Sequence, residues 1–124
     1  YLVDYTPLPI DRFGRVQPEV QKTSLGASET IAWQHTKDGE VLVQISAAKA
    51  DGYQLVAVVH TATSVDFRSF EPADKVAFVF GNEVEGVSEV FLEAADTVIE
   101  LPMAGSKESL NVSVTVGATL YRYR

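Results

Sequence analysis

An alternation of short apolar runs with amphipathic segments is the feature of this sequence that most constrains its fold. The apolar runs are Leu55–Val59, Val76–Phe80 and Thr97–Leu101. Each is rich in β-branched residues and bounded by polar residues or glycine, which is typical of buried strands. Strands that alternate with helices are typical of an α/β fold, in which right-handed crossovers connect the strands. The sequence therefore predicts an α/β fold. We expect a largely parallel sheet flanked by helices, with a ligand site beyond the carboxyl ends of the strands.

Two segments, Val41–Ala50 and Val87–Ala94, have the spacing of amphipathic helices. Their apolar faces are Val41, Leu42, Ile45 and Ala48 in the first segment and Val87, Val90, Phe91 and Ala94 in the second. Gly52 stands where the first helix would stop. Tyr5–Gln21 is rich in proline and charge, and this composition predicts a loop.

Length and composition limit the class of protein. The 124 residues, 46% of them hydrophobic, are enough for one core, so we expect a single domain over residues 1–124. The absence of cysteine excludes a disulfide framework and cysteine metal clusters, and no apolar run reaches the roughly 18 residues that span a bilayer. We therefore expect a cytoplasmic protein that does not associate with a membrane and does not bind a metal ion. Because the strand-like Tyr1–Val3 opens the chain without a leader, we expect it to begin inside its domain.

The formal charge of −7 argues against a nucleic-acid partner, because phosphate binding draws its affinity from lysine and arginine. Local charge matters more than net charge, however. The basic residues gather at two places, with Arg12, Arg15 and Lys22 in an early segment and Arg122 and Arg124 in the last three residues. The charge balance therefore leaves RNA open as a partner.

The segment Leu110–Tyr121 has two periodicities at once. Leu110, Val112, Val114 and Val116 alternate as in a strand, whereas Leu110, Val114, Gly117, Ala118 and Tyr121 form a helical stripe. The β-branched content favours a strand, and Ser109 is suited to cap a helix. The residues alone leave both alternatives open.

A glycine-rich loop follows the apolar run Val76–Phe80. Gly81, Asn82 and Glu83 stand at the expected carboxyl end of this strand, and Gly86 precedes a predicted helix. Glycine permits close backbone approach, so exposed amides there can bind a ligand, and the Asn82 and Glu83 side chains can brace neighbouring loops. The alternative is an ordinary glycine-rich turn. A phosphate-binding P-loop is disfavoured, because the loop has no Gly-Lys-Ser/Thr and carries acidic side chains.

Two longer blocks stand in a fixed order: VFGNEVEGVS over Val79–Ser88 and ELPMAGSKESLNVSV over Glu100–Val114. In this order and spacing they resemble the C-terminal signature of the SpoU (TrmH-like) family of SPOUT RNA 2'-O-methyltransferases. Weaker similarity runs through Lys22–Ala27, Trp33 and Gly52–Ser64, so the resemblance covers nearly the whole chain.

The resemblance implies a SPOUT-like fold with a C-terminal trefoil knot over approximately residues 76–124. It also favours one of the two alternatives at the end of the chain, because the family has a helix after Ser-Leu-Asn. We therefore assign Ser109–Tyr121 to a knot-closing helix that helps to form a homodimer.

The resemblance further implies binding of S-adenosylmethionine, largely through main-chain groups. The implied cofactor-binding residues are His60, Thr61, Gly81, Asn82, Glu83, Gly86, Leu101, Met103, Ser109 and Leu110. The implied reaction is ribose 2'-O-methylation of tRNA or rRNA without a metal. The implied catalytic residues are Asn111 and Ser109, which orient the reacting groups, and Glu83, which fixes the neighbouring loop. Their ordinary alternatives are a helix cap for Ser109, a first-turn residue for Asn111 and a surface acid for Glu83.

The sequence departs from the family pattern in one large respect. The family's first motif, an asparagine followed by a catalytic arginine, normally precedes the strand that matches Tyr1–Asp4, and no such motif is present. Two hypotheses follow: an N-terminally incomplete RNA methyltransferase, or a non-catalytic knotted module that binds cofactor or RNA. Smaller departures are Val59, where relatives often have an acid, and Thr115, where they often have alanine. We expect Thr115 to satisfy its hydroxyl through its own helix backbone.

Overall fold

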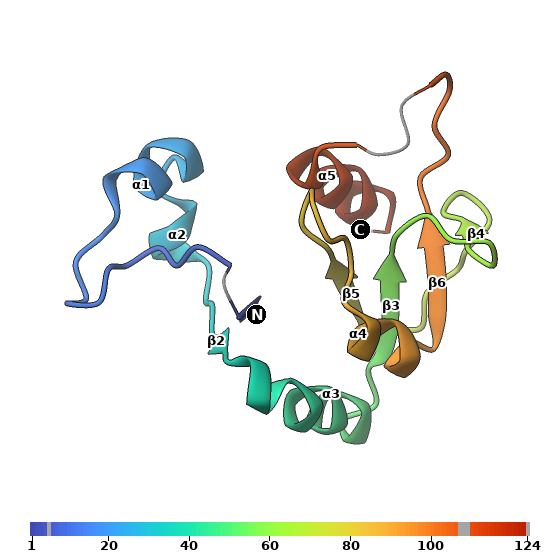
Figure 1. Cartoon of the computed structure of the whole chain (residues 1–124), viewed down its shortest axis with the longest axis horizontal. Helices are drawn as coiled ribbons and strands as arrows, with labels where there is room; N and C mark the ends of the chain where they lie inside the picture. The colour runs from blue at the N-terminus through green and yellow to red at the C-terminus, as the bar shows by residue number, and fades with distance from the viewer. Residues whose placement is uncertain (5, 107–109, 124) are drawn as a thin grey trace. The chain divides into compact units, whose positions relative to one another are not determined.

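The computed structural model describes residues 1–4, 6–106 and 110–123. The chain forms two compact units, Tyr1–Gln44 and Ile45–Arg124 (Figure 1). Each unit is described by itself below, and the expectation of a single domain stays a prediction. Among the described residues, no helix is long and apolar enough to cross a membrane.

A four-stranded sheet forms the centre of the second unit. Its strands are β3 (Gln54–Val58), β4 (Val65–Asp66), β5 (Val76–Phe80) and β6 (Thr97–Glu100). They lie in the order β4-β6-β3-β5, and every pairing is parallel (Figure 1). The predicted parallel sheet flanked by helices is therefore confirmed, and the three predicted strands agree with the structure to within one residue. Only the two-residue β4 was not predicted.

Burial on both faces explains why β3 is apolar along its length. Leu55, Val56, Ala57 and Val58 are all buried, although successive side chains of a strand point to opposite faces. Strands of parallel sheets are covered on both sides and so read as continuous apolar runs. On one face Val56 and Val58 form a buried cluster with Ile99 of β6.

Two helices of the chain match their predicted positions closely. Helix α3 spans Val41–Ala50 as predicted, and Gly52 ends it with a φ of +82°, a left-handed conformation that glycine adopts without strain. Within its predicted apolar face, Val41 and Ile45 are buried but Leu42 is 62% exposed, so the prediction for Leu42 was wrong. Leu42 fails because it lies at the edge of the apolar stripe, about 100° round the helix from Val41.

Helix α4 (Glu89–Ala94) begins two residues later than predicted. Val87 does not belong to it and is instead buried at the end of the glycine-rich loop. Ser88 takes the N-cap position with extended backbone angles, as an N-cap residue does.

Helix α5 (Val112–Arg122) decides between the two periodicities in favour of the helix. It begins three residues later than predicted, because Asn111 is its N-cap: the Asn111 side chain accepts a hydrogen bond from the Ser113 amide. Ser109, which we expected as the cap, lies outside the described residues. The Thr115 hydroxyl donates to the Asn111 carbonyl at 3.2 Å, which confirms the expectation that its own helix backbone satisfies it.

Tyr123, just after α5, attaches this helix to the core. Its ring stacks on Phe78 with centroids 5.5 Å apart and meets Phe70 edge-on at 5.8 Å. Its hydroxyl donates to the Phe67 carbonyl, and burial raises the pKa of the phenol above its ordinary value. The trefoil knot over residues 76–124 stays a prediction, because part of the segment that would close it, residues 107–109, lies outside the described residues.

The first unit contains short elements. Strands β1 (Leu2–Val3) and β2 (His35–Thr36) pair in parallel, and helices α1 (Pro18–Ser24) and α2 (Ala27–Thr30) and the 3-10 turn η1 (Asp38–Glu40) complete it. The prediction of a loop over Tyr5–Gln21 was wrong from residue 18 on. Pro18 occupies the first position of α1, where its missing amide hydrogen costs nothing.

Candidate functional site

A pocket of about 190 Å³ lies where β3, β5 and β6 end. Since the three strands are parallel, the loops that follow them gather at one edge of the sheet, which is where ligands bind in such folds. The pocket is lined by Val58, Val59, His60, Phe80, Gly81, Asn82, Glu83, Gly86, Val87, Leu101, Met103, Leu110, Val112 and Thr115. The structure thus has a pocket at the carboxyl ends of the strands, where the sequence predicts a ligand site.

The glycine-rich loop after β5 closes on itself. Residues Asn82 and Gly86 form an antiparallel bridge, and the Gly86 amide donates to the Asn82 carbonyl at 3.1 Å. A Cβ atom on Gly81 would stand 2.0 Å from the Gly86 carbonyl carbon, so no other residue fits at position 81 without a backbone shift. Gly86 has a φ of +69°, which also favours glycine. At these two glycines the pocket wall consists of main-chain atoms.

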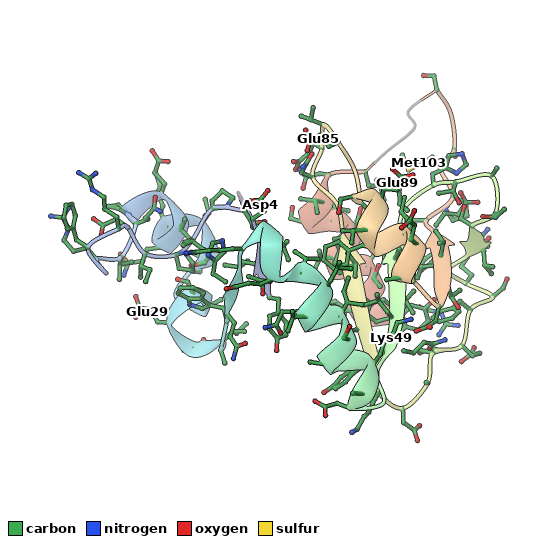
Figure 2. The ribbon with its side chains drawn as sticks, turned by 60° about the horizontal axis from the view of Figure 1, so that its bottom comes forward. Asp4, Glu29, Lys49, Glu85, Glu89 and Met103 are labelled. Carbon is green, nitrogen blue, oxygen red and sulfur yellow. The ribbon has the colours of Figure 1, made fainter. Side chains whose placement is uncertain are left out.

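Asn82 braces this loop from within. Its Oδ1 atom accepts hydrogen bonds from the Val84 amide at 2.8 Å and from the Glu85 amide at 2.7 Å. Figure 2 shows Glu85 on this loop and Met103 on the loop after β6, near the same end of the second unit. These hydrogen bonds lie within the loop that contains Asn82 itself, and the expectation that Asn82 and Glu83 brace neighbouring loops stays a prediction.

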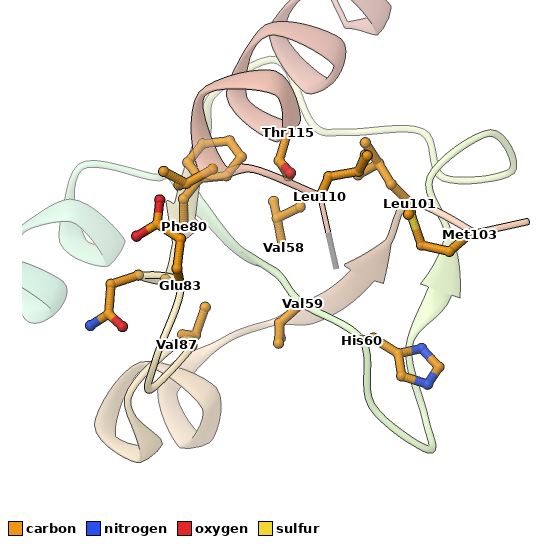
Figure 3. Close-up of a pocket in the computed structure, with 14 residues that line it drawn as sticks. Val58, Val59, His60, Phe80, Glu83, Val87, Leu101, Met103, Leu110 and Thr115 are labelled. Atoms are coloured by element: carbon orange, nitrogen blue, oxygen red, sulfur yellow. The ribbon is translucent and has the colours of Figure 1, made fainter. Parts of the chain in front are cut away.

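The interior of the pocket is mostly apolar. Figure 3 shows Phe80 and Glu83 on one side and Leu101 and Met103 on the other, with Val58 between them. Two ionisable side chains, His60 and Glu83, are among the lining residues, and no described lining residue is lysine or arginine. The pocket therefore suits a flat apolar group together with a neutral or cationic group, rather than a phosphate.

His60 is held at the edge of the pocket by an acid. Its Nδ1 atom is hydrogen-bonded to the Glu100 carboxylate at the end of β6. This hydrogen bond is the main cause that holds the pKa of Glu100 below its ordinary value. The pair connects the loop after β3 to the end of β6 on this side of the pocket.

The start of α5 forms the remaining wall. Leu110 and Val112 line the pocket, whereas Asn111 between them does not. The Oδ1 atom of Asn111 caps the helix through the Ser113 amide at 2.9 Å. The role expected for Asn111 in orienting the reacting groups stays a prediction.

The structure brings most of the predicted site residues together. His60, Gly81, Asn82, Glu83, Gly86, Leu101, Met103 and Leu110 all line the pocket. Thr61 does not line it and instead forms a turn in which its carbonyl accepts from the Ser64 hydroxyl at 2.8 Å. Ser109 lies outside the described residues. The cofactor-binding and catalytic roles of all these residues stay predictions.

Sequence reasoning missed several lining residues. They are Val58, Val59, Phe80, Val87, Val112 and Thr115. Each except Val58 is next to a predicted site residue or one helical turn beyond one, and Val58 is two residues before His60, so the end of each strand was the available signal. Phe80 and Val58 resemble ordinary core residues in the sequence, and nothing in the pattern separates a core side chain from one that faces a pocket.

Parallel strands, a backbone-walled loop and an apolar pocket at the carboxyl edge of the sheet define an α/β ligand-binding fold. The chain belongs to the SpoU rRNA methylase family, whose model matches residues 8–121. The resemblance stated from the two sequence blocks is therefore confirmed.

Curated relatives of the chain are RNA methyltransferases. A tRNA (guanosine(18)-2'-O)-methyltransferase of Aquifex aeolicus is 44% identical over 73 residues, which cover 59% of this chain and 35% of that enzyme. A 23S rRNA (guanosine-2'-O-)-methyltransferase of Ralstonia nicotianae is 31% identical over 113 residues, which cover 91% of this chain and 44% of that enzyme. The chain thus spans less than half the length of these relatives.

Solved structures of the same family have the same fold. The A. aeolicus TrmH/SpoU tRNA-modifying enzyme matches with a TM-score of 0.75 and 30% identity, over 90% of this chain and 54% of that chain. An AdoMet-bound rRNA methyltransferase from Sinorhizobium meliloti matches with a TM-score of 0.79 and 26% identity, over 97% of this chain and 42% of that chain.

Proposed function

We propose that this protein is an S-adenosylmethionine-dependent RNA methyltransferase that methylates a ribose 2'-hydroxyl of tRNA or rRNA. The observation that carries the proposal is the pocket at the carboxyl edge of the sheet, with its Gly81–Gly86 backbone wall, in a chain of the SpoU family. The names of the relatives, which act on guanosines of tRNA and 23S rRNA, support the same reaction.

The lining residues fit S-adenosylmethionine by their chemistry. Apolar side chains such as Val58, Phe80 and Leu101 suit an adenine ring, and the bare backbone of the glycine loop can accept and donate hydrogen bonds. The carboxylate of Glu83 complements the positive charge of a sulfonium or ammonium group. The lack of lysine and arginine among the described lining residues argues against a phosphate-bearing cofactor.

When bound, S-adenosylmethionine supplies an electrophilic methyl group. The chain's own residues have to align a ribose hydroxyl with it and exclude water, because positioning provides most of the acceleration in such a transfer. In this proposal the side-chain amide nitrogen of Asn111 and the hydroxyl of Ser109 orient the reacting groups, and Glu83 fixes the glycine loop. Among the cofactor-binding residues, Thr61 and Ser109 rest on the family resemblance alone.

A homodimer in the cytoplasm is part of the same proposal. Helix α5 supports it, because Val114 and Tyr121 lie seven residues apart on one helical face and are 53% and 78% exposed. Exposed apolar side chains on one face of a helix are typical of a covered surface. A second copy of the chain is the occupant that the family resemblance implies.

Calorimetric titration of the protein with S-adenosylmethionine and with its demethylated product tests the proposal. We expect saturable binding of both ligands. Binding should be lost in Gly81→Asp, because the new side chain collides with the Gly86 backbone and adds negative charge. The same preparations are then incubated with labelled S-adenosylmethionine and bulk tRNA or rRNA, and labelled 2'-O-methylnucleosides are quantified after digestion.

The matched control is Gly39→Ala, because a Cβ at Gly39 meets nothing within 4 Å. It should bind cofactor as the unaltered protein does. Absence of cofactor binding in a folded sample contradicts the proposal, and so does binding that survives Gly81→Asp.

A second candidate is a non-catalytic module that binds cofactor or RNA. Saturable cofactor binding without any labelled 2'-O-methylnucleoside would select this candidate.

A further inference from the structure

A tight turn in the first unit presents an aromatic ring close to two arginines. Ile10 and Val16 form an antiparallel bridge, and the chain turns between them. Phe13 lies in this turn and is 67% exposed. The Arg12 and Arg15 guanidinium carbons lie 4.8 Å and 5.1 Å from the centre of the Phe13 ring, so the three side chains form one group. We refer to Arg12, Phe13 and Arg15 as the aromatic turn cluster.

The turn is held rigid by one acid. The Oδ1 atom of Asp11 accepts hydrogen bonds from the Phe13 amide at 2.8 Å and from the Arg15 amide at 2.9 Å. Its Oδ2 atom accepts from Nε of Arg15 at 2.9 Å. Gly14 has a φ of +78°, which the turn needs and glycine allows. The cluster is therefore preorganised, and a ligand would not have to order it.

The hydrogen bonds that hold the turn leave most of the arginine donor groups available to a ligand. Among the described residues no acid lies within ion-pair distance of Arg12, and Arg15 donates to the Asp11 carboxylate through its Nε atom. Two arginines against one aspartate leave a net positive charge at the turn, in a chain with a formal charge of −7. A polyanion is repelled by the chain as a whole and attracted to this turn.

We infer that the aromatic turn cluster is a docking site for single-stranded RNA. An unpaired nucleobase stacks on the Phe13 ring or on the adjoining guanidinium planes, and the arginines bind the flanking phosphates. A phenyl ring without hydrogen-bonding groups reads no base edge, so the site is tolerant of sequence and serves to hold RNA. The inference rests on the proposed function in taking RNA as the partner, and it concerns residues other than those that line the pocket.

Fluorescence anisotropy of a labelled ten-nucleotide single-stranded RNA of mixed sequence, titrated with the protein, tests the inference. Stacking on an aromatic side chain is worth about 1–3 kcal/mol per base, so Phe13→Ala should weaken binding by at least about fivefold. Phe13→Tyr retains a ring and should restore the affinity. Arg12→Gln should weaken binding and reduce the slope of log affinity against log salt by about 0.7, the value of one single-strand phosphate contact.

Two matched variants control for general effects. Tyr53→Ala removes another ring that lies near a cation, with Lys75 Nζ 5.6 Å from its centre. Lys37→Gln removes an exposed positive charge from the same unit as the cluster. Both should leave RNA affinity and its salt slope unchanged. Thermal unfolding of each variant shows whether the fold is kept. If Phe13→Ala does not fold, the dependence of RNA affinity on salt in Arg12→Gln tests the docking site instead.

Each result supports or overturns the inference. Equal RNA affinity in the unaltered protein and Phe13→Ala overturns it, as does a protein that binds no RNA. A poly-glutamate peptide that binds as tightly and with the same dependence on Phe13 also overturns it, since the turn would then be an acidic-protein site. Cofactor titration separates the two proposals: its failure removes the proposed function, whereas intact cofactor binding with unchanged RNA affinity removes the docking site alone.

Discussion

Gly81 illustrates how one residue determines a pocket wall. The space that a side chain would need there is occupied by the Gly86 backbone, and the Asn82–Gly86 bridge keeps it so. The pocket is thereby limited by main-chain atoms on this side. A close contact between two glycines is a packing requirement and does not depend on the charge of a substituent.

We therefore expect that Gly81→Ala is sufficient to disrupt the loop. A single methyl group 2.0 Å from the Gly86 carbonyl carbon forces the backbone apart, at a cost of about 1–3 kcal/mol of stability. Urea unfolding measures this cost, and cofactor titration should show affinity lowered at least about tenfold. Gly39→Ala, with open space around its Cβ, should match the unaltered protein in both measurements. Unchanged cofactor affinity in Gly81→Ala would show that the loop is not part of the cofactor site.

Asn111 combines a structural contact with a proposed catalytic one, and two substitutions separate them. Asn111→Asp keeps the oxygen that caps α5 but removes the amide nitrogen, so stability should be retained while methyl transfer falls at least about tenfold. Asn111→Ala should lose methyl transfer and also about 1 kcal/mol of stability, the usual value of an N-cap. Chemical unfolding and the methyl-transfer assay are measured on both variants. Full activity in Asn111→Asp would reduce Asn111 to a helix cap.

At the scale of elements, the Asp96 side chain connects its own loop to β3 and to α3 by hydrogen bonds. It lies between α4 and β6, and its Oδ2 atom accepts from the Leu55 amide of β3 at 2.8 Å. Its Oδ1 atom accepts from Nζ of Lys49 in α3 at 2.7 Å. The Lys49 hydrogen bond, followed by that from Leu55, lowers the pKa of Asp96 below its ordinary value of 3.8.

This contact predicts a dependence of stability on pH. Since the pKa of Asp96 is lower in the folded state, its contribution is fully present above about pH 4 and is lost as the pH falls through the folded-state pKa. Asp96→Asn should therefore be less stable than the unaltered protein at pH 7, and the difference should shrink as the pH falls below about 4. Urea unfolding at several pH values measures it. Asp74→Asn, an exposed aspartate of the same unit, is the control, and a constant Asp96→Asn difference would contradict the prediction.

Two kinds of element could be predicted from the sequence. They are the strands that are buried on both faces of the sheet and the segments that match one of the two sequence blocks of the SpoU family. Strands β3, β5 and β6 each contain successive apolar residues, as is typical of a sheet that is covered on both faces, and these runs are visible in the sequence. Strand β4 was missed because two residues carry no periodicity. Helix α5 has both periods, and only the family resemblance decided between them. Helix α1 was missed because proline was taken as a loop signal, although Pro18 begins the helix.

The candidate site shows the same limit. The resemblance identified the glycine loop and the segment before α5, and the structure gathers their residues around one pocket. Phe80, Val87 and Thr115 could not be predicted, because whether an apolar or half-buried side chain faces a pocket or the core depends on how neighbouring loops bend. Local periodicity carries no information about that.

At the scale of the whole molecule, the exposed face of α5 gives a test of assembly. Tyr121→Glu should convert the proposed homodimer to a monomer, because it places a charge in the centre of an apolar contact. Sedimentation velocity measures the molecular mass in solution. Leu25→Glu, at an apolar residue that is 91% exposed in the first unit, is the matched control and should remain dimeric. A monomeric unaltered protein would contradict the proposed dimer.

The closed loop after β5 has a consequence for how this family can vary. In the proposed cofactor site this loop contributes main-chain atoms, so substitutions at Val84, whose side chain is 93% exposed, should leave that surface unchanged. Gly81 and Gly86 have no such freedom, because one lacks room and the other needs a left-handed backbone. A saturation library across the loop should therefore tolerate almost any residue at position 84 and almost none at its two ends. The ligand surface and the outer surface of the loop can thus evolve independently.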